Sequence, residues 1–538
     1  MIGVIANPTE LAVVREFFEL FKTPWEFCRS DRKYEVLVCA TDSNFNKNAA
    51  KVLLIYGGQK LTFDSEENID IASQRKGNRV LSYNGTGIPI YGDCVTFRGE
   101  GGFLRDQESQ LPAIRLRQSS EMVVARIGYN LFGEVRALLT AGQPAANAAI
   151  PALELHIAVL RDLIVMSGVS LTEIPPVPDG YRFIACLTHD VDHPSIRLHK
   201  FDHTMFGFLY RAILGSLCNV VCGRMSFHNL LINWAAAVKV PFVHLGIARD
   251  FWYEFDSYTK LEKGLRSSFF VIPFKGRPGR TGSGPAPSRR ASPYGANEIA
   301  EHVRKLMSAG CEIGLHGIDA WFESTEGREE LEEIRRITGK SDIGVRMHWL
   351  YFREQTPGTL EKAGANYDST VGYNETVGYR AGTTQAYKPL EANQLLELPL
   401  HIMDTALFFP GHLHLFPKEA SKRVGAIIDN AVRFGGVVTV NWHDRSIAPE
   451  RLWGDFYLQL IDELKNKGAW IATAAEAVSW FRKRRSATFE GLGGELTAEI
   501  GADLPGLRLI VHTRGKAPQD SLINGAVSGL ARPSLDTK

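Results

Sequence analysis

Two aspartates, Asp190 and Asp192, stand one residue apart in the segment ACLTHDVDHP at residues 185–194, and histidines flank the pair. If the apolar run before them forms a strand, side chains alternate between its faces, so both carboxylates point the same way. Two like charges held this close raise each other's pKa unless a cation or a hydrogen bond intervenes. Such a pair is typical of a site that holds a metal ion or keeps one carboxylate as a base. A strand that simply ends in a polar turn is the alternative.

Further polar side chains follow later apolar runs between about residues 181 and 484. They are His316 with Asp319 one turn on, Arg346 and His348, Glu397 and Asp404, and His443 and Asp444. The runs alternate with helical stretches, a pattern that indicates a parallel sheet. In a parallel barrel the carboxyl ends of the strands share one rim, so residues far apart in sequence come together. The pattern therefore predicts a divalent-metal site on that rim.

Seven apolar runs must position these residues as strands. They are RFIACLTHD, RSSFFVIP, CEIGLHG, IGVRMHW, LLELPLHIMD, GVVTVNWHD and WIATAAEAVSWF. Helices are predicted between several of them, such as ANEIAEHVRKLMSAG and REELEEIRRITG. Insertions interrupt the alternation at about 195–260, which is apolar and helical, and at about 276–295, which is rich in Pro, Gly, Ser and Arg. The second insertion is predicted as a mobile loop on the same rim, either a lid or an inert insert.

The barrel is flanked by two other regions. Residues 1–178 mix helix-like and strand-like runs and predict a smaller α/β domain, to which no chemistry can be assigned. The segment 121–132, EMVVARIGYNLF, is expected to be helical or buried, and the Pro-rich segment EIPPVPDGYRF is expected to link this domain to the barrel at 179–484. The tail at 485–538 has one strand-like piece, LRLIVHTRG, and is predicted as a small appendage or as partly disordered.

Composition limits the class of protein and its partners. The 538 residues are 44% hydrophobic and 22% charged with a net charge of +1, which is typical of a soluble globular chain without attraction to nucleic acid. Seven scattered cysteines do not predict a disulfide framework. The N-terminus resembles no signal peptide, so a cytoplasmic location is expected. Residues 205–245 predict amphipathic helices that either cover a core or contact the inner face of a membrane peripherally.

Several motifs occur in a characteristic order. THDVD, GLHG, the arginine segment around Arg346, YDSTVGY at 367–373 and the late NWHD resemble those of the polysaccharide deacetylases of the NodB homology family, carbohydrate esterase family 4. The resemblance covers roughly residues 181–484 and is to a divergent branch, with HDVD in place of TFDD. It implies a distorted (β/α) barrel, a divalent metal such as zinc, and hydrolytic removal of acetyl groups from glycans.

The resemblance also implies individual roles. Asp190 matches the catalytic base, Asp192 a metal ligand, and His316 the first histidine of the metal pair. His443 matches the late histidine that acts as general acid, and Arg346 matches the arginine that orients the base. A bound metal would polarise the acetyl carbonyl and lower the pKa of water to roughly 7.

The sequence departs from the family's pattern at the second metal histidine, whose place is taken by Ala320. His348, which replaces an apolar position in the arginine motif, is our first candidate for the third ligand, and Asp319 and His189 are the alternatives. Two other family positions also differ. Glu397 or Asp404 stands in for a later aspartate, and Trp349 replaces a tyrosine whose backbone helps to stabilise an oxyanion.

Three functions follow from these observations. The leading hypothesis is a metal-dependent hydrolase that removes acetyl groups from an N-acetylated sugar or polysaccharide. The second is a metal-dependent hydrolase of another C–N bond, in an amide or a ureide. The third, which Ala320 favours, is a catalytically inactive carbohydrate-binding or scaffold protein of glycan assembly. The sequence does not predict the sugar, the linkage or the oligomeric state.

Overall fold

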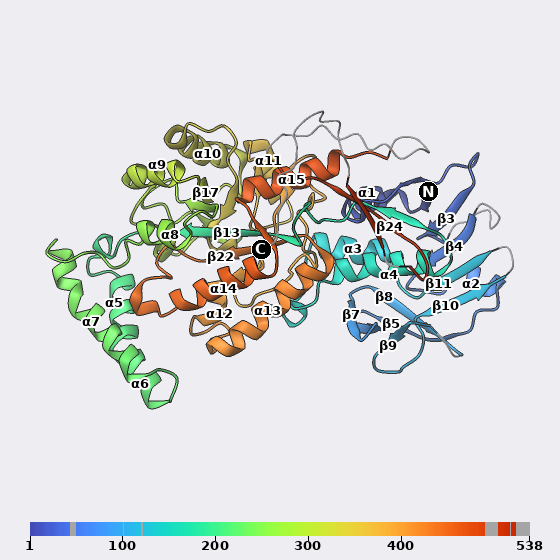
Figure 1. Cartoon of the computed structure of the whole chain (residues 1–538), viewed down its shortest axis with the longest axis horizontal. Helices are drawn as coiled ribbons and strands as arrows, with labels where there is room; N and C mark the ends of the chain where they lie inside the picture. The colour runs from blue at the N-terminus through green and yellow to red at the C-terminus, as the bar shows by residue number, and fades with distance from the viewer. Residues whose placement is uncertain (43–49, 100–101, 120–121, 490–503, 517, 523–538) are drawn as a thin grey trace, which may run out of the picture.

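The computed structural model describes residues 1–42, 50–99, 102–119, 122–489, 504–516 and 518–522. In this part of the chain nine strands form the larger sheet, and every pair is parallel (Figure 1). Their order is β20-β19-β18-β17-β14-β13-β22-β21, with β23 beside β13. The bounds are β13 Phe183–Val191, β14 Ser267–Val271, β17 Glu312–Gly317, β18 Val345–Met347, β19 Tyr367–Asp368, β20 Leu396–Glu397, β21 Ile402–Met403, β22 Val437–Asn441 and β23 Ala469–Ile471.

Helices cover this sheet, which is why its strands are apolar on both faces. All nine residues of β13 are buried, as in parallel sheets packed on both sides. The helices are α8 Phe255–Leu261, α9 Ala300–Ser308, α10 Ser324–Thr338, α11 Thr356–Ala363, α12 Asp404–Phe408, α13 Pro417–Phe434, α14 Gly454–Asn466 and α15 Ala474–Ser486. The predicted distorted parallel (β/α) barrel is thus confirmed.

The strands depart from the sequence prediction in three places. LLELPLHIMD was expected to form one strand but forms the two short strands β20 and β21, because Pro399 between them has no N–H for a sheet hydrogen bond. WIATAAEAVSWF begins as β23 and continues as α15, which Thr473 and Glu476 start with a reciprocal capping box. The strand β19, inside YDSTVGY, was not predicted as a strand.

The N-terminal region also belongs to the predicted α/β class. Its sheet has the order β10-β11-β4-β3-β1-β2, and all its pairs are parallel except β10 with β11. The strands are β1 Ile2–Ile5, β2 Trp25–Phe27, β3 Tyr34–Cys39, β4 Ala50–Tyr56, β10 Ile114–Gln118 and β11 Val123–Ile127, and the helices are α1 Leu11–Phe21, α2 Thr62–Glu66, α3 Leu131–Leu139 and α4 Ala152–Met166. Within the segment 121–132, which was expected to be helical or buried, Val123–Ile127 form β11 and α3 begins at Leu131, with its first turn capped by the side chain of Asn130. Residue 121 lies outside the described residues.

Shorter strands complete this region. They are β5 Ile71–Lys76 with β8 Asp93–Phe97, and β6 Arg79–Tyr83 between β7 Thr86–Ile90 and β9 Leu104–Asp106. The predicted tail strand is β24, Arg508–His512, which pairs with β12, Leu171–Glu173, and with β25, Gln519–Leu522. Residues 490–503 and 523–538 of the predicted tail lie outside the described residues. The division of the chain at about 178 and 485 stays a prediction.

Buried polar contacts join the barrel to the smaller domain. The guanidinium group of Arg484, at the end of α15, donates to the carbonyls of Leu20 (2.9 Å) and Ile174 (2.7 Å). Glu154 of α4 accepts a hydrogen bond of 2.6 Å from Thr383, in the segment that follows β19. Removing one partner of such a contact would leave the other buried and unpaired, which costs about 1–3 kcal/mol. These buried hydrogen bonds hold the barrel and the smaller domain together.

The two insertions lie at the carboxyl end of the barrel strands. The first forms α5 His203–Tyr210, a short π-helix Arg211–Gly215, α6 Ser216–Val221 and α7 Phe227–His244. These helices project from the barrel at the left of Figure 1. We call α5 to α7 the arm. The second insertion forms the small hairpin β15 Arg280–Thr281 and β16 Gly284–Pro285. It is fastened by Arg290, a buried side chain that donates to the carbonyls of Ile318 (2.8 Å) and His348 (3.2 Å).

Candidate metal centre and active site

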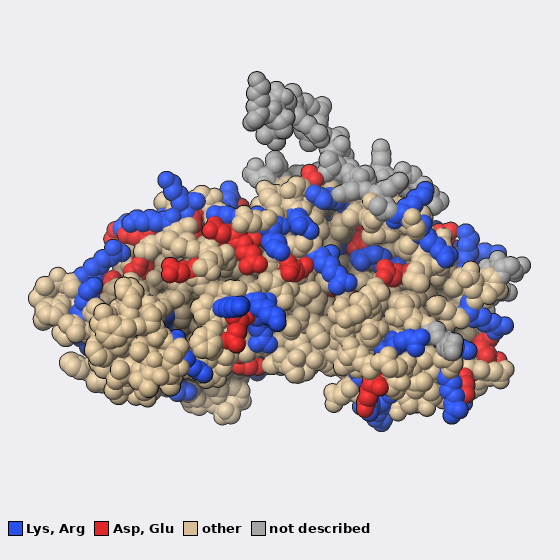
Figure 2. Space-filling view, turned by 60° about the horizontal axis from the view of Figure 1, so that its bottom comes forward, with Lys and Arg blue, Asp and Glu red and all other residues tan. Residues whose placement is uncertain are grey.

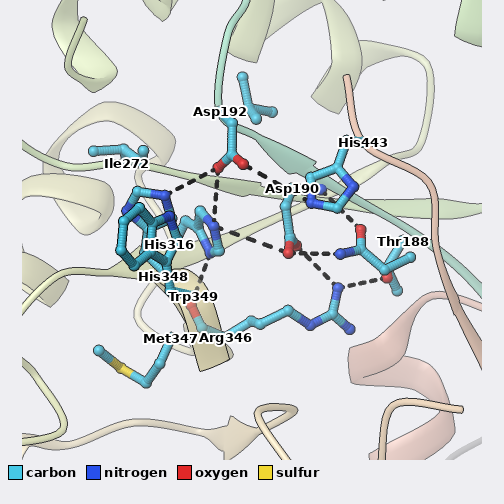
Figure 3. Close-up of polar contacts among 12 residues, drawn as sticks. Thr188, Asp190, Asp192, Ile272, His316, Arg346, Met347, His348, Trp349 and His443 are labelled. Carbon is cyan, nitrogen blue, oxygen red and sulfur yellow. Dashed lines mark hydrogen bonds and ion pairs between the residues drawn. The ribbon is translucent and has the colours of Figure 1, made fainter. Parts of the chain in front are cut away.

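Side chains from four strand ends meet at one edge of the larger sheet (Figure 3). They are Asp190, Asp192, His316, Arg346, His348 and His443. The strands are β13, β17, β18 and β22, which all run parallel, so their carboxyl ends lie on the same edge. The structure therefore brings together all six residues that the sequence singled out for the site.

Asp192, His316 and His348 form a cluster of three possible metal ligands. One ligand atom from each lies within 4.8 Å of the other two. Oδ1 of Asp192 is 3.2 Å from Nε2 of His316 and 3.5 Å from Nε2 of His348. This oxygen is buried and has no hydrogen-bond partner among the described residues, so its lone pairs are free for a cation. One carboxylate and two imidazoles are a donor set that suits zinc with an open coordination position.

The histidines of the cluster are oriented for this role. Nδ1 of His316 lies 3.0 Å from the carbonyl oxygen of Arg346, an acceptor, so Nδ1 is the donor and Nε2, which faces Asp192, is the atom that would bind a cation. Burial lowers the pKa of His348 to about 3, which keeps that imidazole neutral. Burial opposes a charge on Asp192, yet the imidazoles of His348 and His316 lower its pKa well below the usual range. The residues therefore fit a divalent cation.

Asp190 lies beside the cluster and is held by other groups. Its Oδ1 is 3.0 Å from Nη1 of Arg346, and its Oδ2 accepts a hydrogen bond of 2.7 Å from Nδ2 of Asn441. Burial would raise the pKa of this carboxyl, but the charges of Arg346, His316 and His443 together outweigh burial and lower it. Oδ2 is 3.9 Å from Nε2 of His316. Asp190 is thus an ionised, oriented carboxylate at the edge of the candidate metal position.

His443 stands on the other side of Asp192, paired with Asp404. Nδ1 of His443 is 2.6 Å from Oδ1 of Asp404, and the backbone N–H of His443 donates to Oδ2 at 2.7 Å. Burial lowers the pKa of His443, but Asp404 and the carboxylates of Asp192 and Asp190 outweigh it and raise the pKa to about 10. Nε2 lies 3.8 Å from Asp192. The imidazole can therefore hold a proton that it presents to the site.

Of the three candidates for the third metal ligand, only one lies close enough to Asp192 and His316. Asp319 accepts a hydrogen bond of 2.7 Å from the backbone of Arg280 and is not part of the cluster. His189 points to the other face of β13, where its ring nitrogens lie 2.7 Å from the carbonyl of Trp442 and 3.1 Å from Glu262. His348 alone of the three belongs to the cluster.

Ala320 has no room for a larger side chain. It is fully buried, and a methyl group added to Gly327 of α10 would lie only 3.3 Å from its Cβ. A histidine at this position would meet α10 instead of the site. Likewise, Glu397 is buried away from the cluster and accepts a hydrogen bond from the backbone of Val371 at 2.8 Å, so Asp404 is the acid that serves the site.

Sequence reasoning missed two residues of the site, Asn441 and Arg290. Asn441 is the last residue of β22 and pairs in register with Thr188, which places its amide beside Asp190. It stands directly before the WHD of NWHD, but no signal in the sequence gives the register that brings its amide to Asp190. Arg290 lies in the second insertion, where nothing in the sequence distinguishes it from the neighbouring arginines.

A cavity of about 1050 Å³ opens over the cluster and is lined by the metal-site residues, His443 and Trp349. Trp349 and Leu350 both adopt left-handed backbone conformations, with φ of 63° and 52°, which are rare for such large residues. The turn that they form follows His348 directly. It brings the indole of Trp349 to 5.9 Å from the His348 ring, between centroids, at the wall of the cavity.

The comparisons with known proteins concern the barrel. No family model matches the chain, and no curated protein matches its sequence. Among solved structures, a polysaccharide deacetylase from Mycobacterium smegmatis is 20% identical and matches over 58% of this chain and 95% of its own, with a TM-score of 0.34. One from Pseudomonas aeruginosa is 13% identical over 58% and 94%, with a TM-score of 0.35. Puue allantoinase is 12% identical over 57% and 93%, with a TM-score of 0.34.

Polysaccharide deacetylases, the class of protein whose motifs the sequence resembles, are thus among the solved structures that match the barrel. At these identities the likeness concerns the fold alone, and every quoted TM-score is below 0.5. The function is therefore argued from the side chains of the site.

Proposed function

We propose that the protein is a metal-dependent hydrolase that removes the acetyl group from an N-acetylated sugar. The observation that carries this proposal is the cluster of Asp192, His316 and His348, whose ligand atoms lie within 4.8 Å of one another. An acid and a base candidate flank it, which is the constellation that hydrolysis of an amide requires. A divalent cation held by the three residues, zinc by the donor set, would supply a Lewis acid for the carbonyl and water of lowered pKa.

Asp190 is the proposed general base. Its carboxylate is kept ionised by Arg346 and fixed in direction by two donors, Arg346 and Asn441, so it can accept a proton from an attacking water without first reorienting. Arg346 is itself fastened by Thr188, at 2.6 Å from Oγ1, and by the carbonyl of Ser369 at 3.0 Å. Arg346 is thus a positioning residue for the base.

His443 is the proposed general acid. Asp404 holds Nδ1, so the proton on Nε2 faces the cavity and can be given to the departing nitrogen. A cation bound at Asp192 would lower the pKa of His443 from its raised value, because like charges oppose each other. The site thus contains a carboxylate kept ionised and an imidazole kept protonated, which assigns base and acid.

The experiment is to measure metal content and acetate release with the purified protein. N-acetylated chito-oligosaccharides serve as substrate, and Asp192→Asn and His316→Ala are the test variants. We expect bound divalent metal and acetate release in the wild-type protein and a loss of both in each variant. Equal metal content in wild type and both variants would count against the proposal.

The two other functions give different outcomes. A hydrolase of amides or ureides would release no acetate but would still need metal. An inactive carbohydrate-binding protein would bind glycans without turnover, and chelation would not change that binding. The alanine at position 320 favoured an inactive protein because it removed a ligand. That argument is weaker now, because His348 supplies a third possible ligand.

A further inference from the structure

The arm and the residues directly before and after it expose many large apolar side chains. Most of the exposed large apolar side chains in the described chain belong to this insertion: Phe201, Phe206, Tyr210, Ile213, Leu214, Leu217, Val221, Phe227, Leu231, Trp234, Val238, Phe242, Leu245 and Ile247. Several are more than half exposed, such as Val238 at 67% and Leu245 at 72%. An exposed apolar surface of this extent marks an interaction site in a soluble protein.

The charges of the arm identify the kind of surface that it fits. Between Asp202 and Asp250 the sequence contains no Asp or Glu, whereas Arg211, Arg224 and Lys239 lie on the arm itself. Figure 2 shows the left end of the molecule, where Figure 1 places the arm, as a largely uncharged surface. Apolar side chains together with cations and without carboxylates are typical of a helix that lies in the interface of an anionic phospholipid membrane.

The arm is shaped to lie on a membrane and not to cross it. His203–Val221 is long and apolar enough to span a bilayer by length and composition. However, Phe208 and Ala212 on one side of it are buried in a cluster with residues of α7, with Trp252, and with Ala448 of the segment that follows β22. Arg211, in its middle, is tied to Glu450 by an ion pair of 3.9 Å. A helix held at these points is buried on one side only, and the opposite side is the one that could contact lipid.

The arm also forms part of the wall of the active-site cavity. The cavity of about 1050 Å³ over the metal cluster is lined as well by Gly207, Tyr210 and Arg211. A molecule bound with its acetyl group at Asp192 therefore extends toward the helices that face the membrane. This continuity suits a substrate that is polar at one end and apolar at the other.

Three arginines lie on the same wall of the cavity, with Glu450 as a neighbouring carboxylate, 3.9 Å from Arg211. Arg211, Arg445 and Arg451 line the cavity, and Arg451 is only 6% exposed. Nε and Nη1 of Arg451 and Nη2 of Arg211 are buried without a hydrogen-bond partner in the described part of the chain. Unpaired guanidinium donors in such a place are costly unless a ligand accepts them, and phosphate oxygens match their geometry.

From these observations we infer that the substrate is an N-acetylated sugar joined through phosphate to a lipid, taken from the surface of an anionic membrane on which the arm lies. The inference rests on the proposed function for the acetyl hydrolysis. In that reaction water adds its oxygen to the acetyl carbon and gives a proton to Asp190, the C–N bond breaks, and acetate leaves. The nitrogen keeps its own hydrogen and gains a second one from His443, so that it leaves as an amine. The phosphate and its bond to the lipid are unchanged, because the arginines bind the phosphate without reacting with it.

Membrane binding is tested by sedimentation of the full-length protein with vesicles of phosphatidylcholine and phosphatidylglycerol in equal parts. The test variant is Val238→Glu/Leu245→Glu, and the matched control is Leu116→Glu, an exposed apolar residue of the smaller domain that is 45% exposed. We expect the wild type and the control to sediment with the vesicles and the test variant to lose about tenfold in affinity. Wild-type protein that stays in the supernatant overturns the inference. So does a dimer in light scattering that the test variant dissociates, because the arm would then pair with a second copy.

The substrate class is tested by acetate release from three compounds. They are a polyprenyl-phosphate-linked N-acetylglucosamine in the same vesicles, N-acetylglucosamine 1-phosphate, and N-acetylglucosamine. We expect the phosphorylated sugar to be preferred over the free sugar, and the lipid-linked sugar over both. Arg451→Gln should reduce the preference for phosphate about tenfold, with Lys239→Gln, on the arm outside the cavity, as its control. Equal rates with all three compounds overturn the inference while leaving the proposed function intact. Vesicle binding without acetate from any compound overturns the proposed function instead.

Discussion

Nε2 of His348 lies 3.5 Å from Oδ1 of Asp192, although the two residues follow β18 and β13, with β17 and β14 between those strands. His348 directly precedes a sharp turn at Trp349 and Leu350. The side chain of His316, at the end of β17, lies between the two and is 3.2 Å from the same oxygen. The third residue of the cluster therefore comes from the end of β18 and not from a second histidine in the segment that follows β17.

We predict that His348→Ala removes the metal. One of three ligands is lost, so metal affinity should fall about 100-fold or more and acetate release should fall with it. Elemental analysis after dialysis measures the metal, and Asp319→Ala is the control because Asp319 lies outside the cluster. If His348→Ala kept the metal and Asp319→Ala lost it, the third ligand would be Asp319 and not His348.

Ala320→His should not supply the missing ligand. Ala320 is fully buried against Gly327 of α10, so an imidazole there overfills the core and should cost about 1–3 kcal/mol of stability or more. The expected result is a lower melting temperature and, in the double variant Ala320→His/His348→Ala, no recovery of metal. Recovery of metal in the double variant would show that position 320 does reach the site.

Asp404→Asn should change the pH profile of the reaction. Asp404 raises the pKa of His443, so its replacement by a neutral amide lowers that pKa. A general acid must be protonated, so the alkaline limb of the kcat profile should move to lower pH, and kcat should fall about 10- to 100-fold. Steady-state rates between pH 5 and 11 measure this, with Asp319→Asn as the control. If kcat fell but the alkaline limb of the pH profile did not move, Asp404 would stabilise the fold without setting the pKa of His443.

The sequence predicts the long strands and the residues at their ends because burial on both faces leaves an unmistakable apolar run, as in β13. The strands β19 and β20 have two residues each, too few to show any period, and only their neighbours in the sheet define them. The roles of Asp190, Asp192 and His316 likewise follow from strand ends and motif order.

The role of Asn441 could not be predicted in the same way. It depends on the register of β22 against β13, which pairs Asn441 with Thr188, and no local pattern specifies register between strands more than 240 residues apart. The unpaired donors of Arg451 arise for a similar reason. They result from the packing of the arm on the barrel, which is a property of the tertiary structure.

His156→Gln should alter how stability depends on pH. His156 is buried in α4, and burial lowers its pKa to about 3, whereas an unfolded chain binds the proton at its ordinary value of about 6.5. Because the unfolded state binds more protons below pH 6.5, this residue costs the folded state about 1.4 kcal/mol for each pH unit of acidification from 6.5 toward 3. Melting temperatures between pH 7.5 and 5 should therefore fall less steeply in His156→Gln than in the wild type, while exposed His228→Gln should follow the wild type. Parallel curves for His156→Gln and the wild type would show that His156 is protonated in the folded protein, with its Nδ1, which lies 3.2 Å from the hydroxyl of Tyr129, as the donor.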